Sequence, residues 1–121
     1  MSHKILIADD EPNIVASLEF LLGAAGFQVE SVTDGGQAMA RIETEPPDLI
    51  LLDIMMPVLS GYEVCQRVRA NPAWSRIRIV MLTARGREVE VDKGLALGAD
   101  AYVTKPFSTQ DLVAKVRELL T

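Results

Sequence analysis

The chain has 121 residues and a net charge of −5, a size typical of one domain. Hydrophobic residues make up 49% and charged residues 24%, a globular rather than disordered composition. The acidic balance argues against nucleic acid or an anionic membrane as a direct partner. The single cysteine, Cys65, excludes an intrachain disulfide, and no apolar run approaches membrane-spanning length. We therefore expect one domain over residues 1–121, in the reducing cytoplasm.

Five short β-forming runs alternate with longer segments of helical periodicity. The predicted strands are Ile5–Ala8, Val29–Val32, Leu49–Leu52, Ile77–Leu82 and Ala101–Val103. Three of them are almost continuously apolar, which is typical of strands covered on both faces. The pattern predicts an α/β fold with a parallel sheet between two layers of helices.

Punctuation residues mark the helices between these strands. Pro12 and Gly26 bracket the first helix, and Ser108 is placed to cap the last, with Asp111 as its reciprocal partner. The other three helices are predicted to end before Pro46, at Asn71-Pro72 and at Gly98. Since the last helix reaches the end of the chain, we expect no output domain in these 121 residues.

Polar residues follow four of the predicted strands. They are Asp9, Asp10 and Glu11 after the first, Asp53 after the third, Thr83 after the fourth, and Thr104 and Lys105 after the fifth. Ligands of open parallel sheets bind at the carboxyl ends of the strands. If these strands are neighbours, three aspartates, a hydroxyl and an ammonium group meet on one rim.

The electrostatics of such a rim indicate a cation. Two carboxylates about 5 Å apart repel by roughly 3 kcal/mol at an effective dielectric constant near 20. Oxygen ligands without histidine or cysteine favour Mg²⁺ or Mn²⁺ over zinc. An aspartate beside this ion and a lysine is a suitable nucleophile for phosphorus.

At these residues the chain resembles the receiver domain of two-component response regulators. The motifs are Ile5–Glu11, Leu51–Pro57, Met81–Ala84, Gly98–Asp100 and Tyr102–Phe107. The resemblance implies a flavodoxin-like (βα)₅ fold with strand order 2-1-3-4-5. It also implies that Asp53 accepts the phosphoryl group. Asp10, Asp53 and the Met55 backbone carbonyl would bind Mg²⁺ directly, and Asp9 mostly through water.

The resemblance further implies a switch. Lys105 would pair with the phosphoryl oxygens and Thr83 would hydrogen-bond one of them, while Tyr102 would turn inward as Thr83 moves. The Lys105–Pro106 bond would be cis. Met55 and Arg85, which flank the site, would tune the lifetime of the acyl phosphate.

The implied function is a signalling switch phosphorylated by a sensor histidine kinase or a phosphotransfer protein. The domain would catalyse only its own phosphorylation and slow dephosphorylation, and would act on an unidentified output protein or a missing effector domain. Mixed charges near the fourth and fifth helices leave a phosphorylation-dependent homodimer open. They are Lys93, Asp100, Asp111, Lys115 and Arg117.

Other interpretations remain open from the residues alone. Asp9 and Asp10 are also good caps for the first helix. A metal-dependent phosphatase would use similar groups, although haloacid-dehalogenase enzymes place two aspartates two residues apart after one strand, usually with a cap domain. A receiver that has lost phosphorylation would serve only as an interaction module.

Overall fold

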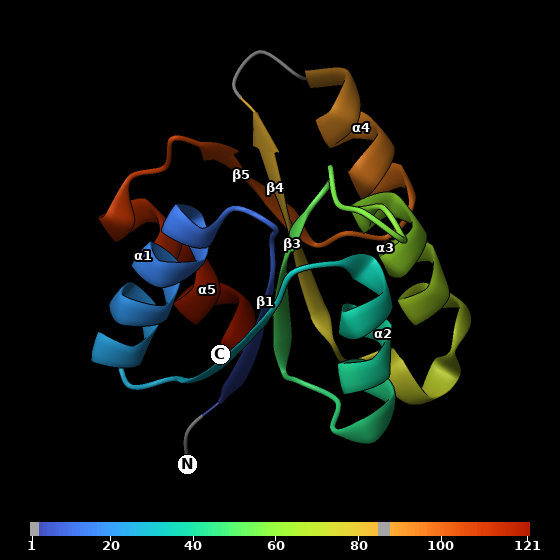
Figure 1. The fold of residues 1–121 in the computed structure, drawn as a ribbon, viewed down its shortest axis with the longest axis horizontal. Helices are drawn as coiled ribbons and strands as arrows, with labels where there is room; N and C mark the ends of the chain where they lie inside the picture. The colour runs from blue at the N-terminus through green and yellow to red at the C-terminus, as the bar shows by residue number, and fades with distance from the viewer. Residues whose placement is uncertain (1–2, 85–87) are drawn as a thin grey trace.

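In the computed structural model, strands and helices alternate along the whole chain (Figure 1). The structure describes residues 3–84 and 88–121. The strands are β1 (Lys4–Ala8), β2 (Gln28–Val32), β3 (Leu49–Asp53), β4 (Arg78–Ala84) and β5 (Ala101–Lys105). The helices are α1 (Pro12–Ala24), α2 (Gly35–Thr44), α3 (Gly61–Ala70), the 3₁₀ turn η1 (Pro72–Trp74), α4 (Glu88–Ala96) and α5 (Thr109–Leu120). Among the described residues, no helix combines the length and apolar character needed to cross a membrane.

The five strands form one parallel sheet in the order β2-β1-β3-β4-β5. This confirms the expected flavodoxin-like topology. The chain steps to one side of β1 and then to the other, so β1 and β3 lie side by side at the switch point. The carboxyl ends of these two strands are therefore the place where a ligand site is expected.

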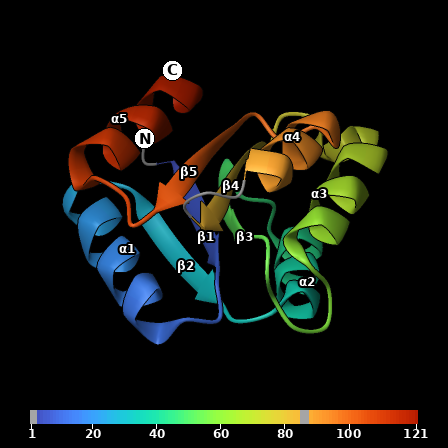
Figure 2. The ribbon, with the colours of Figure 1, turned by 90° about the horizontal axis from the view of Figure 1, so that it is seen from above.

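Helices cover both faces of the sheet. Figure 2 shows α1 and α5 on one face and α2, α3 and α4 on the other. Successive side chains of the central strands alternate between the two layers. Leu49 and Leu51 pack in the α1–α5 layer, whereas Ile50 and Leu52 pack in the α2–α4 layer. Burial on both faces explains why the central strands are almost continuously apolar.

The strands extend further toward the site than predicted. β3 includes Asp53, β4 reaches Ala84 and β5 reaches Lys105, because the ladder continues through the pairs Asp53↔Leu82 and Ala84↔Lys105. Thr83 likewise lies within β4, and Ile77 precedes its first residue. Asp53, Thr83 and Lys105 thus stand on the sheet itself, which holds their backbones rigidly, whereas Asp9 and Asp10 follow the end of β1 as predicted.

Helix ends confirm most of the predicted punctuation. Pro12 begins α1, and Gly26 and Gly98 have positive φ angles of 98° and 109°. The Ser108 hydroxyl accepts a hydrogen bond from the Asp111 amide, as a cap of α5. The capping box with both reciprocal bonds is at the start of α3, between Ser60 and Glu63.

At the opposite edge of the sheet, Asp100 joins three segments: α3, β4 and its own turn between α4 and β5. Its carboxylate accepts hydrogen bonds from the Ile79 amide and from Arg69, both at 2.8 Å, and lies 3.8 Å from Arg78. Arg69 also donates to the Gly98 carbonyl at 2.8 Å. We call Arg69, Arg78 and Asp100 the Asp100 cluster; it ties α3 to the end of α4 and the start of β5.

Candidate phosphoryl and metal site

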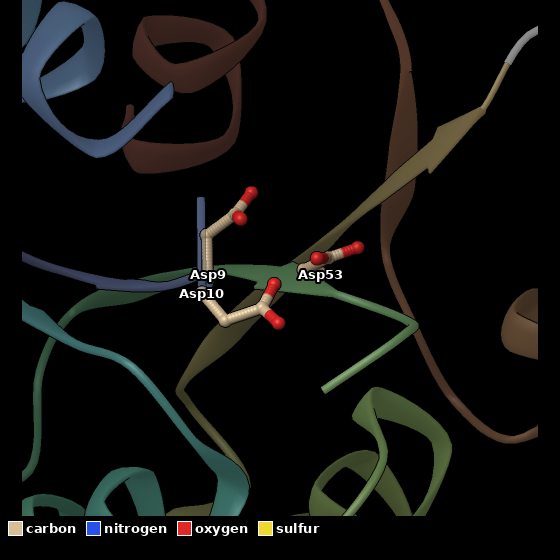
Figure 3. A group of neighbouring side chains, drawn as sticks. All are labelled: Asp9, Asp10 and Asp53. Carbon is tan, nitrogen blue, oxygen red and sulfur yellow. The ribbon is translucent and has the colours of Figure 1, made fainter. Parts of the chain in front are cut away.

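Three carboxylates meet where β1 and β3 end. Figure 3 shows Asp9 and Asp10 extending from the end of β1 and Asp53 from the end of β3. One oxygen from each lies within 4.8 Å of the others. Asp9 is fully buried and Asp53 is 6% exposed, whereas Asp10 is exposed. The expected clustering of the three aspartates on one rim is confirmed.

Asp9 does not cap the first helix. Its Oδ1 accepts a hydrogen bond from the Glu11 amide at 2.9 Å, and Glu11 is the N-cap residue of α1, without a side-chain capping bond. This bond holds the Asp9 carboxylate in the site. The capping interpretation of Asp9 is therefore wrong.

The Lys105 ammonium group lies among the carboxylates. Its Nζ is 2.9 Å from Asp9 Oδ2, 3.2 Å from Glu11 Oε1 and 3.6 Å from Asp53 Oδ2. The contact with Glu11 also has hydrogen-bond geometry. Among the described residues, no hydrogen bond of good geometry reaches the buried Asp9 Oδ2, so the nearby Lys105 ammonium compensates it by charge.

The balance of charge perturbs both Asp53 and Lys105. Burial, followed by the charge of Asp9, raises the pKa of Asp53 from 3.8 to about 6, although the Lys105 charge and the Met55 amide oppose this rise. Burial alone lowers the pKa of Lys105, but its contact with Asp9 and the charges of Asp53 and Asp9 raise that pKa overall. The rim thus carries more negative charge than one ammonium offsets.

The donor set fits a small hard cation. Three carboxylate oxygens can converge on one point, and the buried Asp9 oxygen has only charge compensation. A cavity of about 370 Å³ opens beside them, with Asp10, Asp53 and Met55 in its lining. These residues offer oxygen ligands of the kind that Mg²⁺ prefers.

The two expected switch residues lie on neighbouring strands. Thr83 is buried and its hydroxyl is 3.5 Å from the Ala84 carbonyl oxygen. Tyr102 is 45% exposed and pairs in register with Met81, two residues before Thr83. Their side chains therefore stand on the same face of the sheet. The Lys105–Pro106 bond is cis, as expected.

The loop after Asp53 is packed tightly against the site. The Gly61 amide donates to the Ile54 carbonyl at 2.9 Å, and a Cβ at Gly61 would lie 2.3 Å from the Asp53 carbonyl oxygen. Val58 has a φ of 70°, an unusual angle for a β-branched residue. The Leu59 amide bonds the Pro57 carbonyl across it at 2.9 Å.

Sequence comparison assigns this arrangement to a family. The model of the response regulator receiver domain matches residues 5–117. The chain belongs to the response regulator receiver family. The family predicted from the sequence motifs, the receiver domains of two-component systems, is thus confirmed.

Two curated relatives and one solved structure illustrate this membership. The chain is 46% identical to the phosphate regulon regulator PhoB of Rhizobium meliloti and 45% identical to the alkaline phosphatase synthesis regulator PhoP of Bacillus subtilis. Each alignment covers 99% of this chain, but 53% and 49% of the relatives. The chemotaxis response regulator CheY4 of Vibrio cholerae superposes with a TM-score of 0.92 at 31% identity, covering 99% of this chain and all of CheY4. The receiver chain thus spans about half the length of these curated relatives.

Two residues of the receiver site had no predicted role. Glu11 pairs with Lys105, and Glu90 of α4 lines the same cavity as Asp53. The Tyr62 hydroxyl donates to the Glu90 backbone carbonyl at 3.1 Å, and Lys93 lies 4.5 Å above the Tyr62 ring. Its position next to Asp10 could have identified Glu11 as a residue of the site. No sequence signal connects Tyr62 with α4.

Met55 and Arg85 are the two residues expected to tune the lifetime of the acyl phosphate. Met55 is 69% exposed and lines the cavity, so its side chain stands at the mouth of the site. Arg85 lies outside the described residues.

Proposed function

We propose that this receiver is a phosphorylation-operated switch whose acceptor is Asp53. The observation that carries this proposal is the meeting of Asp9, Asp10 and Asp53 with Lys105 at the switch point of the sheet. A cluster with excess negative charge is costly to keep unless it serves a ligand. Asp53 belongs to this cluster, lines the cavity and lies 3.6 Å from the Lys105 ammonium group, which places it beside the cation that would receive the phosphoryl oxygens.

The donor would be a phosphohistidine of a sensor histidine kinase or a phosphotransfer protein. An oxygen of ionised Asp53 attacks phosphorus while the P–N bond to the donor breaks. The imidazole leaves with the bonding electron pair and takes up a proton. Above about pH 6 Asp53 is largely ionised, as the attack requires. The Lys105 ammonium offsets the charge on the phosphoryl oxygens.

Asp9, Asp10, Asp53 and the Met55 carbonyl would hold Mg²⁺, or Mn²⁺. The ion supplies positive charge that lets an anionic phosphoryl donor approach the acidic rim. Asp10 is exposed and can replace its water shell by an ion at low cost, whereas buried Asp9 acts mainly through the charge that it places behind Lys105.

The phosphoryl group would be sensed by Thr83. Its long contact with the Ala84 carbonyl is weak, so the hydroxyl can turn to donate to a phosphoryl oxygen. Tyr102 then moves inward on the same face of the sheet. The changed surface comprises α4, β5 and α5, and one electrostatic event thereby biases a two-state element.

The partners of the domain follow from the same proposal. The domain catalyses only its own phosphorylation and dephosphorylation, in the cytoplasm, and passes the signal to an output protein or a C-terminal effector domain. It binds no nucleic acid or membrane directly. A homodimer would use charges such as exposed Asp111 and half-buried Lys115, because Asp100 is already paired within the chain with Arg69 and Arg78.

Intact mass spectrometry after treatment with acetyl phosphate and Mg²⁺ tests this function. We expect one added phosphoryl group on the wild type and none on the Asp53→Asn variant. Omission of Mg²⁺ should prevent the addition in the wild type. An unmodified wild type, or equal modification of both proteins, would contradict the proposal.

A further inference from the structure

The three carboxylates around Lys105 differ in how easily they can release it. Asp9 is fully buried, and Asp53 is almost so, whereas the Glu11 side chain is 59% exposed. A buried carboxylate that loses its cation cannot be rehydrated and pays the full cost of desolvation. Glu11 can exchange Lys105 for water at little cost.

The ammonium group has three N–H donors, and three carboxylates surround it. A phosphoryl group on Asp53 brings about 1.5 to 2 further negative charges and strong acceptor oxygens. Among the described residues, the Lys105 contact with Glu11 is the one that has hydrogen-bond geometry, whereas Asp9 and Asp53 act by charge, so a donor that turns to a phosphoryl oxygen leaves Glu11. Asp53 carries the new group itself, and Asp9 stays buried 2.9 Å from the Lys105 ammonium group.

We propose that Glu11 is a positioning residue that occupies the phosphoryl-binding donor of Lys105 until Asp53 is phosphorylated. This inference rests on the proposed function of Asp53. Glu11 holds Lys105 at the cavity mouth in the unphosphorylated state and yields to the phosphoryl oxygens. Its contact competes with phosphorylation, so losing the contact should favour the phosphorylated form and the binding of phosphoryl analogues.

Two variants separate this contact from the simple effect of charge. Glu11→Gln removes both the charge and the ion pair. Glu11→Asp keeps the charge, but its side chain is shorter by one methylene group, which carries the carboxylate out of contact with Lys105. Since Glu11 is the N-cap residue of α1, an aspartate there also turns toward the helix amides.

The measurements are the rate of phosphorylation by acetyl phosphate and the affinity for beryllofluoride in Mg²⁺, followed by NMR. We expect both to rise about threefold in both variants, in the range for loss of a largely exposed ion pair. Unfolding midpoints should show that Glu11→Asp is no less stable than the wild type. A purely structural role would not couple equal stability with faster phosphorylation.

A double-mutant cycle with Lys105→Met tests whether Glu11 acts through Lys105. In that background the Glu11 substitutions should leave beryllofluoride affinity unchanged. Faster reaction of Glu11→Gln alone would indicate repulsion of the anionic donor, and slower reaction of both variants would indicate that Glu11 orients Lys105 productively. Either result overturns the inference. If the wild type takes up no phosphate, the proposed function fails first; if it does and both variants match it, only this inference fails.

Discussion

Two aspartates at opposite edges of the sheet have opposite surroundings. Asp53 lies beside Asp9 and Asp10 and shares the Lys105 ammonium group with Asp9 and Glu11. Asp100 lies between two guanidinium groups and accepts a backbone hydrogen bond as well. At the Asp100 edge the surplus is positive, and within the part of the chain that the structure describes the buried Arg69 Nη1 has no hydrogen-bond partner.

The difference separates a structural carboxylate from a functional one. Asp100 satisfies three segments of the chain, so its removal leaves donors and a cation without a partner. Asp53 is held in place by the fold but is poorly compensated, so its removal relieves repulsion. A carboxylate that the native state tolerates at a cost is a candidate for ligand chemistry.

The largest effect is expected at the Asp100 cluster. Asp100→Ala should lower the free energy of unfolding by about 4 kcal/mol, because Arg69 and the Ile79 amide lose their partner. Urea denaturation measures this. Asp100→Asn keeps an acceptor for the Ile79 amide and should lower the free energy of unfolding by less. A loss below about 1 kcal/mol for Asp100→Ala would erase the contrast between the two edges.

Asp53→Asn should instead stabilise the protein in metal-free buffer. A pKa raised from 3.8 to about 6 corresponds to roughly 3 kcal/mol of cost for the ionised native form. Well below pH 3.8 Asp53 is protonated in both the folded and the unfolded state, so the cost is absent; the cost grows between about pH 4 and pH 6 and is constant above that range. The gain should therefore be full at pH 7.5 and vanish near pH 3.5.

Urea titrations of both proteins across that pH range measure this gain. The exposed carboxylate of Asp92 offers a matched control, since Asp92→Asn should change stability little at either pH. A variant that is less stable than the wild type at pH 7.5 would contradict the described charge balance.

Mg²⁺ should reduce this cost in the wild type. An ion at tenfold excess over its Kd adds about 1.4 kcal/mol to the stability of the native state. Thermal melts with and without millimolar Mg²⁺ should show a higher Tm for the wild type and little change for Asp10→Asn. An unchanged wild-type Tm would argue against a metal site on the rim.

The smallest effect is expected where α3 meets α4. Tyr62→Phe removes the hydroxyl that bonds the Glu90 carbonyl and should cost about 1 kcal/mol. Faster amide hydrogen exchange in α4 than in α5 would localise this loss. Equal exchange in both helices would show that the contact does not hold α4 in place, leaving the Asp100 cluster as its stronger attachment.

Much of this site could be predicted because parallel strands bring their carboxyl ends to one edge. That rule is enough to gather Asp53, Thr83 and Lys105 from residues far apart in the chain. The order of the strands came from family resemblance, since the βα pattern alone is compatible with several orders.

Local geometry set the limits of prediction. Asp9 and Asp10 are adjacent, yet only Asp9 is buried, because successive side chains at the end of β1 point in opposite directions. The bond of Tyr62 to Glu90 joins two helices through a backbone carbonyl, which no pattern of residue types reveals. Similarly, the ion pair between Lys105 and Glu11 depends on a distance that only the folded chain defines.

Gly61 carries one more consequence. Any side chain at this position would press on the backbone of Asp53, the proposed phosphoacceptor. In a library of random variants, substitutions at Gly61 should therefore be depleted as strongly as those at Asp53, although glycine has no group that could touch phosphate. An alignment-based search for reactive residues would then report an inert position, and a steric requirement would be mistaken for chemistry.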